Sequence, residues 1–189
     1  MANTNISRKK IATCLWFGHG QAHEAAKFYA ATFPDSHVET RHLSPSDYPD
    51  GKQGDELTVE FTVLGMPFLG INGGSQFKFN EAVSFMVYTD SQEGTDRYWN
   101  AIVGNGGQES HCGWCKDRFG VSWQITPRAL MNAMSDPDRV AAKRAMEAMM
   151  GMRKIDIAAI ERARGGAGPM SLGDAQQLPL QVGGLGEMV

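Results

Sequence analysis

Cys112 and Cys115 are separated by two residues, which is the spacing of a redox-active dithiol. The first thiol of such a pair normally stands at a helix N-terminus, because the helix dipole lowers its pKa. Here the pair lies at the end of a predicted strand, directly before a turn over residues 116–120. Two cysteines are also two ligands short of a zinc ribbon. The spacing therefore indicates an incidental pair. The third cysteine, Cys14, is expected to be a small buried residue or part of a cleft wall.

The segment after that turn alternates between apolar and polar side chains, which is the pattern of a half-buried strand. The apolar set faces one side and comprises Val121, Trp123 and Ile125. The polar set faces the other side and comprises Ser122, Gln124 and Thr126. A buried strand that presents a hydroxyl, an amide and a second hydroxyl on one face is expected to line a cavity. Together with the run before the turn, it predicts a β-hairpin over residues 112–127.

Five histidines are the remaining candidates for acid–base or metal chemistry. His19 and His23 stand before and at the start of a predicted helix, where the dipole disfavours a charged imidazole and solvated positions explain them. The other three lie on polar strands and are expected to be exposed: His37, His42 and His111. Glu60 shares a strand face with Thr58 and Thr62, which is either a cleft wall or a solvated surface. The histidines by themselves do not predict a metal site.

The elements that would carry these residues follow one another in the same order twice. The first unit is a strand, a helix and three strands, at residues 10–17, 21–33, 36–43, 56–64 and 67–72. The second unit is a strand, a helix, a strand and the second strand of the hairpin, at residues 82–89, 91–103, 108–114 and 121–126. This recurrence predicts an internal duplication at the level of structure.

Two such modules predict an α+β fold. We expect two tandem βαβββ modules to form an eight-stranded, incompletely closed barrel with helices outside, a cleft within, and C-terminal helices. The expected boundaries are one domain over 8–164, with module one at about 8–73, module two at about 80–127 and the C-terminal helices at about 136–164. A stripe of Ala and Met in those helices is expected to pack against the domain or a second subunit. Residues 165–189, rich in Gly, Pro and Gln, are expected to form a disordered tail.

Composition narrows the classes of partner. The chain has 189 residues, 42% of them hydrophobic and 21% charged, as in ordinary globular proteins. A net charge of −3, with scattered basic residues, argues against a nucleic-acid partner. No apolar run reaches the roughly 18 residues of a membrane helix, and no cleavable leader is evident. We therefore expect a cytoplasmic protein with neither a nucleic-acid nor a membrane partner. The odd number of cysteines, three, suits that compartment.

Several segments resemble the PhnB-like branch of the vicinal-oxygen-chelate superfamily, which includes glyoxalase I, bleomycin-resistance proteins and extradiol dioxygenases. The similar segments are the family's first helix, inter-module linker, second helix, final hairpin and C-terminal helix, at residues 24–29, 72–85, 96–99, 112–127 and 152–157. The resemblance covers residues 8–164 and implies paired βαβββ modules and a homodimer. Many members carry the label 3-demethylubiquinone-9 3-methyltransferase.

Enzymes of this superfamily hold a divalent metal between four strands through His or Glu side chains, and the metal polarises two neighbouring substrate oxygens. The resemblance places the four ligand positions near Cys14, Phe68, Ala82 and Gln124. Alanine and phenylalanine cannot coordinate a metal, and a neutral amide is a weak ligand. We therefore expect no metal, and no other cofactor, in this protein.

The leading hypothesis is a metal-free cleft that binds a small apolar or aromatic molecule, with or without catalysis. Apolar walls with a few convergent polar groups are the usual composition of such a site. The cleft is expected to be lined by Cys14, Trp16, Phe68, Ser84, Met86, Tyr88, Trp114, Ser122 and Gln124.

Three alternatives remain open. A metal-dependent lyase, isomerase or dioxygenase would need ligands outside the expected register, such as His19, His23 or Glu60. A purely structural dimer would fill the cleft with its own side chains. A methyltransferase would bind S-adenosylmethionine through a glycine-rich turn between a strand and a helix. The glycine run at 70–74 does not precede a predicted helix, and the run at 104–107 follows one, so the sequence does not support the methyltransferase label.

Overall fold

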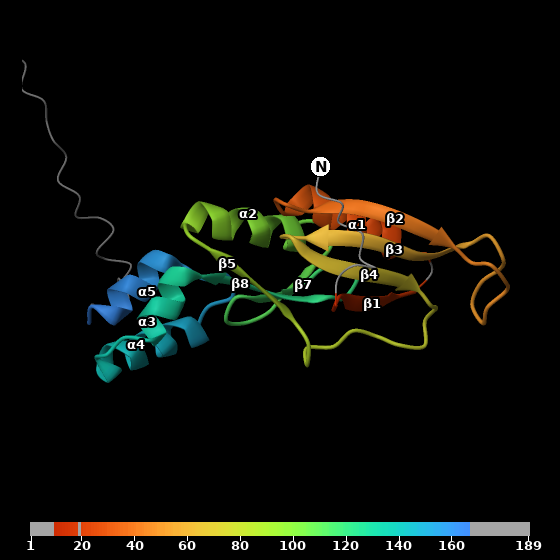
Figure 1. The fold of residues 1–189 in the computed structure, drawn as a ribbon. Helices are drawn as coiled ribbons and strands as arrows, with labels where there is room; N and C mark the ends of the chain where they lie inside the picture. The colour runs from red at the N-terminus through yellow and green to blue at the C-terminus, as the bar shows by residue number, and fades with distance from the viewer. Residues whose placement is uncertain (1–9, 19, 167–189) are drawn as a thin grey trace, which may run out of the picture.

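A computed structural model describes residues 10–18 and 20–166 of the chain (Figure 1). The expected tail, apart from its first two residues, lies outside the described residues, as does His19. Among the described residues, no helix combines the length and the apolar character needed to cross a membrane.

The first module contains four strands and one helix in the expected order. They are β1 (Thr13–Phe17), α1 (Ala22–Thr32), β2 (His37–Leu43), β3 (Glu56–Val63) and β4 (Met66–Asn72). The strands form one mixed sheet in the order β1-β4-β3-β2. β1 runs parallel to β4, and the other neighbours are antiparallel.

The second module repeats this plan. Its elements are β5 (Phe85–Thr89), α2 (Gln92–Val103), β6 (Gln108–Glu109), β7 (Trp114–Lys116) and β8 (Ser122–Pro127). The sheet order is β5-β8-β7-β6, with β5 parallel to β8. The same connectivity in both sheets confirms the predicted duplication and the α+β class. The eight strands belong to two separate sheets and do not close into a barrel within one chain.

The strand expected over residues 108–114 was wrong in its length. β6 has two residues, and residues 110–113 form a turn in which Cys112 and Gly113 have φ values of 59° and 81°. The turn is anchored from the C-terminal segment, because the amides of Cys112 and Gly113 donate to the carbonyls of Met152 and Arg153 at 2.8 and 2.7 Å. Cys112 therefore lies in a turn and Cys115 in β7, so no helix begins at the Cys-x-x-Cys pair.

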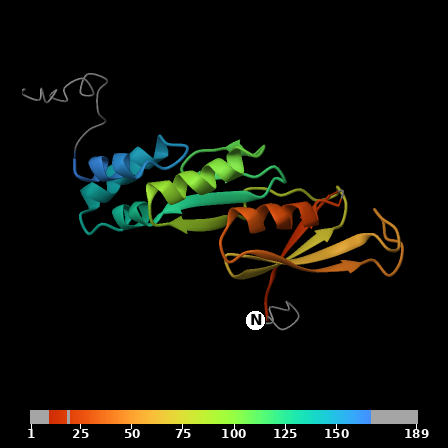
Figure 2. The ribbon, with the colours of Figure 1, turned by 90° about the horizontal axis from the view of Figure 1, so that it is seen from above.

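Both modules share one hydrophobic core, which holds them together as one body. Figure 2 shows the modules side by side along the long axis of the molecule, with one helix beside each sheet. Aromatic rings cross the boundary: Phe68 of β4 contacts Phe85 of β5, and Phe33 stacks on Trp123 of β8, each with centroids 5.1 Å apart. The helices cover one face of each sheet, and we call the opposite faces the helix-free faces.

Three helices follow the second module: α3 (Arg128–Met134), α4 (Arg139–Met150) and α5 (Ile157–Arg164). α3 was not expected. It packs with α4 and α5 in a separate small core around Leu130, Ile155 and Ile160. Much of the predicted Ala and Met stripe of α4, including Ala145 and Met149, faces that core and so packs within the chain.

Candidate functional site

The helix-free face of the second sheet collects most of the predicted site residues. In register, Gln124 of β8 lies between Met86 of β5 and Trp114 of β7, so these three side chains share one face. The Gln124 amide donates to the Ser84 hydroxyl oxygen at 2.8 Å. Tyr88 and Ser122 lie on the same face by strand alternation.

The other predicted residues lie in the first module, on two different faces. Cys14 and Trp16 are on the helix-free face of β1, next to Leu69 and Ile71 of β4. Phe68 lies on the opposite face, where it stacks on Phe61 in the core with centroids 5.3 Å apart and is 2% exposed. The structure therefore does not bring Phe68 together with the other candidates. Because the two modules lie side by side, the two helix-free faces do not close over each other within one chain (Figure 2).

A cavity of about 350 Å³ lies where the end of β1, the inter-module linker and the β7–β8 turn meet. We call it the aromatic groove. It is lined by Trp16, Phe17, Gly18, Gln21, Ser75, Phe77, Lys78, Phe79, Lys116, Phe119 and Gly120. Of the predicted site residues, only Trp16 belongs to it. One feature of the sequence could have indicated the other lining residues. Phe77 and Phe79 stand among polar residues in a predicted loop, and aromatic side chains in a loop usually pack against another part of the protein or a ligand.

The walls of the groove are held by specific contacts. The Trp16 indole packs edge-on against Phe77 at 5.0 Å and donates to the Gly74 carbonyl at 2.9 Å. Gly73 is required beneath this ring, because a Cβ there would lie 2.2 Å from Trp16 Cζ2. On the other side, Phe17 contacts the ring of Phe119 at 6.2 Å. The groove thus has fixed aromatic sides.

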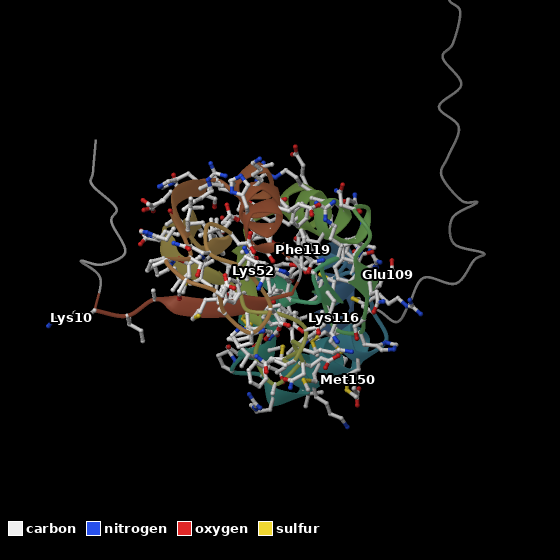
Figure 3. All side chains as sticks on the ribbon, turned by 90° about the vertical axis from the view of Figure 1, so that its right-hand side faces the viewer. Lys10, Lys52, Glu109, Lys116, Phe119 and Met150 are labelled. Carbon is white, nitrogen blue, oxygen red and sulfur yellow. The ribbon has the colours of Figure 1, made fainter. Side chains whose placement is uncertain are left out.

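A second cavity, of about 140 Å³, lies on the helix-free face of the second sheet, and we call it the polar recess. It is lined by Glu81, Gln108, Glu109, Ser110, Trp114, Cys115, Lys116 and Ser122. Lys116 therefore borders both the recess and the groove. In Figure 3 it lies between Phe119, which lines the groove, and Glu109, which lines the recess. Its ammonium pairs with the Glu81 carboxylate at 2.5 Å. The Ser122 hydroxyl is buried and has no hydrogen-bond partner among the described residues.

A third cavity, of about 400 Å³, lies at the same end of the first sheet as the aromatic groove, and Ser75 lines both. Its lining includes three carboxylates, on Asp50, Asp55 and Glu56. Two of them already hold the local structure. Asp55 accepts from the Lys52 amide at 2.7 Å, and Glu56 pairs with Arg41 at 3.4 Å. This cavity holds none of the residues predicted from the sequence.

Burial affects the thiols of two cysteines, Cys115 and Cys14. Burial, with a smaller contribution from the negative charge of Asp117, raises the pKa of the Cys115 thiol to about 12. Burial also raises the pKa of Cys14. Because the thiolate is the nucleophile, a raised pKa lowers the reactivity of both thiols at neutral pH. This agrees with an incidental Cys-x-x-Cys pair.

The side chains present do not fit the metal site of the superfamily. Of the four predicted ligand positions, Cys14 and Gln124 lie on the helix-free faces, with Leu69 and Met86 as their cross-strand neighbours. Phe68 lies in the core, and Ala82 lies in a turn before β5. This donor set contains one protonated thiol, one neutral amide and two apolar side chains, which is unsuitable for a divalent cation.

The substitute ligands considered from the sequence do not gather either. Glu60 lies beside His42 on the first sheet, with 3.2 Å between carboxylate and imidazole. His23 lies on α1, with its Nδ1 buried and unpartnered among the described residues. Over residues 10–18 and 20–166, no three His, Cys, Asp or Glu side chains come together as a set that could hold a metal ion.

Two βαβββ modules with this strand order define a protein of the vicinal-oxygen-chelate fold class. A family model described as 3-demethylubiquinone-9 3-methyltransferase matches residues 9–126. The chain belongs to this family, in its PhnB-like branch, as the resemblance indicated.

The chain is also similar to solved structures, of which the first supports this assignment. A putative 3-demethylubiquinone-9 3-methyltransferase, PhnB protein, from Bacillus cereus is 30% identical, with a TM-score of 0.55, over 63% of this chain and 99% of that one. Protein PA1353 from Pseudomonas aeruginosa is 18% identical, with a TM-score of 0.48, over 62% and 98%. The fosfomycin resistance protein FosX from Listeria monocytogenes is 12% identical, with a TM-score of 0.43, over 63% and 92%. No functionally curated protein matches the chain.

The family label names a methyltransferase, so the two glycine runs were compared with the glycine-rich turn that binds S-adenosylmethionine in such enzymes. Gly73 and Gly74 follow β4 and lead into the inter-module linker, and Gly104 ends α2. Neither run connects a strand to the start of a helix, which is where a glycine-rich turn would hold the cofactor of a methyltransferase.

Proposed function

We propose that the protein binds a small apolar or aromatic molecule in the aromatic groove, without a metal ion. The observation that carries this proposal is the groove itself. Its volume of about 350 Å³ falls in the range of small-molecule sites, and its lining combines five aromatic side chains with two lysines. Flat rings of this kind favour a planar ligand, because stacked and edge-to-face ring pairs are stabilising.

The exposure of Phe77 supports this use of the groove. Its ring is 62% exposed and covers only part of Trp16, so apolar surface remains open to water at the groove. A ligand lying between Phe77 and Phe119 would remove that surface from water and gain the corresponding hydrophobic free energy. Phe77 belongs to the inter-module linker and lies outside both sheets.

We also propose a homodimer in which a second copy covers the helix-free faces. Met86 and Tyr88 are 41% and 45% exposed on a sheet that otherwise resembles a cleft wall, and Cys14 is exposed on the other sheet. A sheet face carrying such apolar side chains is typical of an interface. Light scattering should give twice the mass of the chain, and Met86→Glu should shift it towards the monomer. A wild-type monomer at micromolar concentration would overturn this part of the proposal.

Ligand binding can be tested with 2-naphthamide, a neutral planar aromatic probe, followed by calorimetry. The wild type should bind it saturably, and Phe77→Ala should weaken binding about tenfold through the loss of one aromatic wall. Leu43→Ala is a matched control, because Leu43 is a comparably exposed apolar side chain, 64%, on β2. No saturable binding, or equal weakening by both variants, would overturn the proposal.

Metal content separates this proposal from the metal-dependent alternative. Elemental analysis of protein purified without an affinity tag should find no stoichiometric zinc, nickel, manganese or iron. One metal ion per chain would favour a lyase, isomerase or dioxygenase instead. S-adenosylmethionine, added in the same calorimetric experiment, should neither bind nor compete with 2-naphthamide.

A further inference from the structure

The Ser122 hydroxyl is buried at the edge of the polar recess without a partner. The residue is 2% exposed, and its oxygen has no hydrogen-bond partner among the described residues. An unpaired buried hydroxyl lowers the stability of a protein, and a valine or alanine in its place would avoid that cost. Its presence on the wall of a cavity points to a partner that the chain itself does not supply.

The residues beside Ser122 are mainly hydrogen-bond donors. Register places Ser122 of β8 opposite Lys116 of β7, and Lys116 opposite Gln108 of β6, so the three side chains form one row on the helix-free face. Ser84, directly before β5, accepts from the Gln124 amide and does not line the recess. The ammonium of Lys116, the hydroxyl of Ser122 and the amide of Gln108 lie in one row, which favours an acceptor with negative charge.

One carboxylate already lies at the end of this row. Glu81, on the linker before β5, contacts the Lys116 ammonium at 2.5 Å, while its side chain is 65% exposed. An ion pair with so exposed a partner contributes little to stability, so a competing anion can replace it. The other carboxylate of the recess, on Glu109, is paired with Arg153 at 2.9 Å, which offsets its charge.

We propose that the polar recess binds the carboxylate of a small aromatic acid, which accepts hydrogen bonds from Lys116 and Ser122 and displaces Glu81. Lys116 borders both cavities, so the acid group can lie in the recess while the ring lies in the aromatic groove. This inference rests on the proposed function, because the ring needs the groove. Beyond the proposed function, it specifies that the ligand is negatively charged and that Lys116 and Ser122 select its carboxylate.

The test compares 2-naphthoate with 2-naphthamide, which has the same rings and no charge. The wild type should bind 2-naphthoate about tenfold more tightly, because a hydrogen bond from a charged donor to a carboxylate is stronger than one to a neutral amide. Lys116→Met should abolish this preference, while Lys143→Met, on α4 and paired with exposed Glu147, should leave it unchanged.

Two milder variants keep the proposal falsifiable if Lys116→Met fails to fold. Glu81→Gln removes the internal competitor, so it should tighten 2-naphthoate several-fold and leave 2-naphthamide unchanged. Ser122→Ala should weaken 2-naphthoate several-fold without lowering the melting temperature, because the hydroxyl has no partner to lose. If Glu81→Gln weakens the binding of 2-naphthoate or leaves it unchanged, the inference is wrong.

The outcomes separate the two proposals. Equal binding of both probes, unaffected by Lys116→Met, overturns the carboxylate site and leaves the proposed function standing. Binding of neither probe overturns both. Inorganic phosphate is the third arm. If phosphate alone binds as tightly as 2-naphthoate, the recess is a site for free anions and its assignment to an aromatic acid is wrong.

Discussion

The two modules close their central hairpins in different ways. The β3–β4 hairpin turns through Leu64 and Gly65, whose φ values of 49° and 75° suit a two-residue turn that matches the twist of the strands. The β7–β8 hairpin needs the longer turn 117–121, which is wrapped around the side chain of Asp117. The same topology is therefore closed once by backbone conformation and once by a buried carboxylate.

Asp117 also connects the second hairpin to the first module. It accepts from the amides of Phe119 and Val121, from the Trp123 indole at 2.9 Å and from the Tyr29 hydroxyl of α1 at 2.8 Å. The turn in the first module has no such role, since its contacts stay within that module. The difference matters for the site, because the neighbours of Asp117 on either side of the turn, Lys116 and Phe119, line the aromatic groove.

The largest effect is expected from removing this carboxylate. Asp117→Ala would leave the Tyr29 hydroxyl, the Trp123 indole and two backbone amides buried without an acceptor, which should lower the free energy of unfolding by about 4 kcal/mol. Urea denaturation of the wild type and the variant measures this difference in the free energy of unfolding. Asp117→Asn keeps one acceptor oxygen and should cost less. A cost below about 1 kcal/mol for Asp117→Ala would show that the two hairpins do not differ in this way.

A smaller effect is expected at the first hairpin. Gly65→Ala places a Cβ in open space, so its cost comes from the positive φ alone, about 1 kcal/mol. The same denaturation series should show this loss with no change in the affinity for 2-naphthamide. A weakened affinity would mean that the first turn, too, is coupled to the groove.

The smallest effect concerns pH. Burial raises the pKa of Asp117 above its ordinary value of 3.8, although four hydrogen bonds act in the opposite direction. A carboxyl with a raised folded-state pKa contributes stability that is present below pH 3.8 and is lost as the pH rises through the raised value. The stability advantage of the wild type over Asp117→Asn, which does not titrate, should therefore shrink between pH 3 and neutral pH. An advantage that grows with pH would contradict the raised pKa.

Local patterns predicted the elements well where one face of a strand is polar. β8 is the best example, because strict alternation separated Trp123 in the core from Gln124 on the helix-free face. β4 is the opposite case. Phe68 and its neighbour Leu69 are both apolar, so alternation identifies two faces without showing which one receives the helix. The family resemblance predicts Phe68 at the cleft, whereas the structure places it in the core, stacked on Phe61 of β3.

Two further differences between the predicted and the observed elements are caused by tertiary contacts. β6 ends early because the amides of residues 112 and 113 bond to the C-terminal segment instead of extending the strand. α3 is a short helix whose apolar residues pack against α4, α5 and the Ile155 side chain between them, so its sequence alone gives a weak helical signal.

The sequence by itself determined two βαβββ modules, the final hairpin and a polar strand face lacking the usual metal ligands, because these depend on side-chain alternation and residue type. Only the tertiary structure decided which residues form the aromatic groove. The groove joins β1, the linker and a distant turn, and that meeting depends on how the modules pack across Tyr29 and Asp117. Local periodicity carries no information about such long-range contacts, so Trp16 was predicted while Phe77, Phe119 and Lys116 were not.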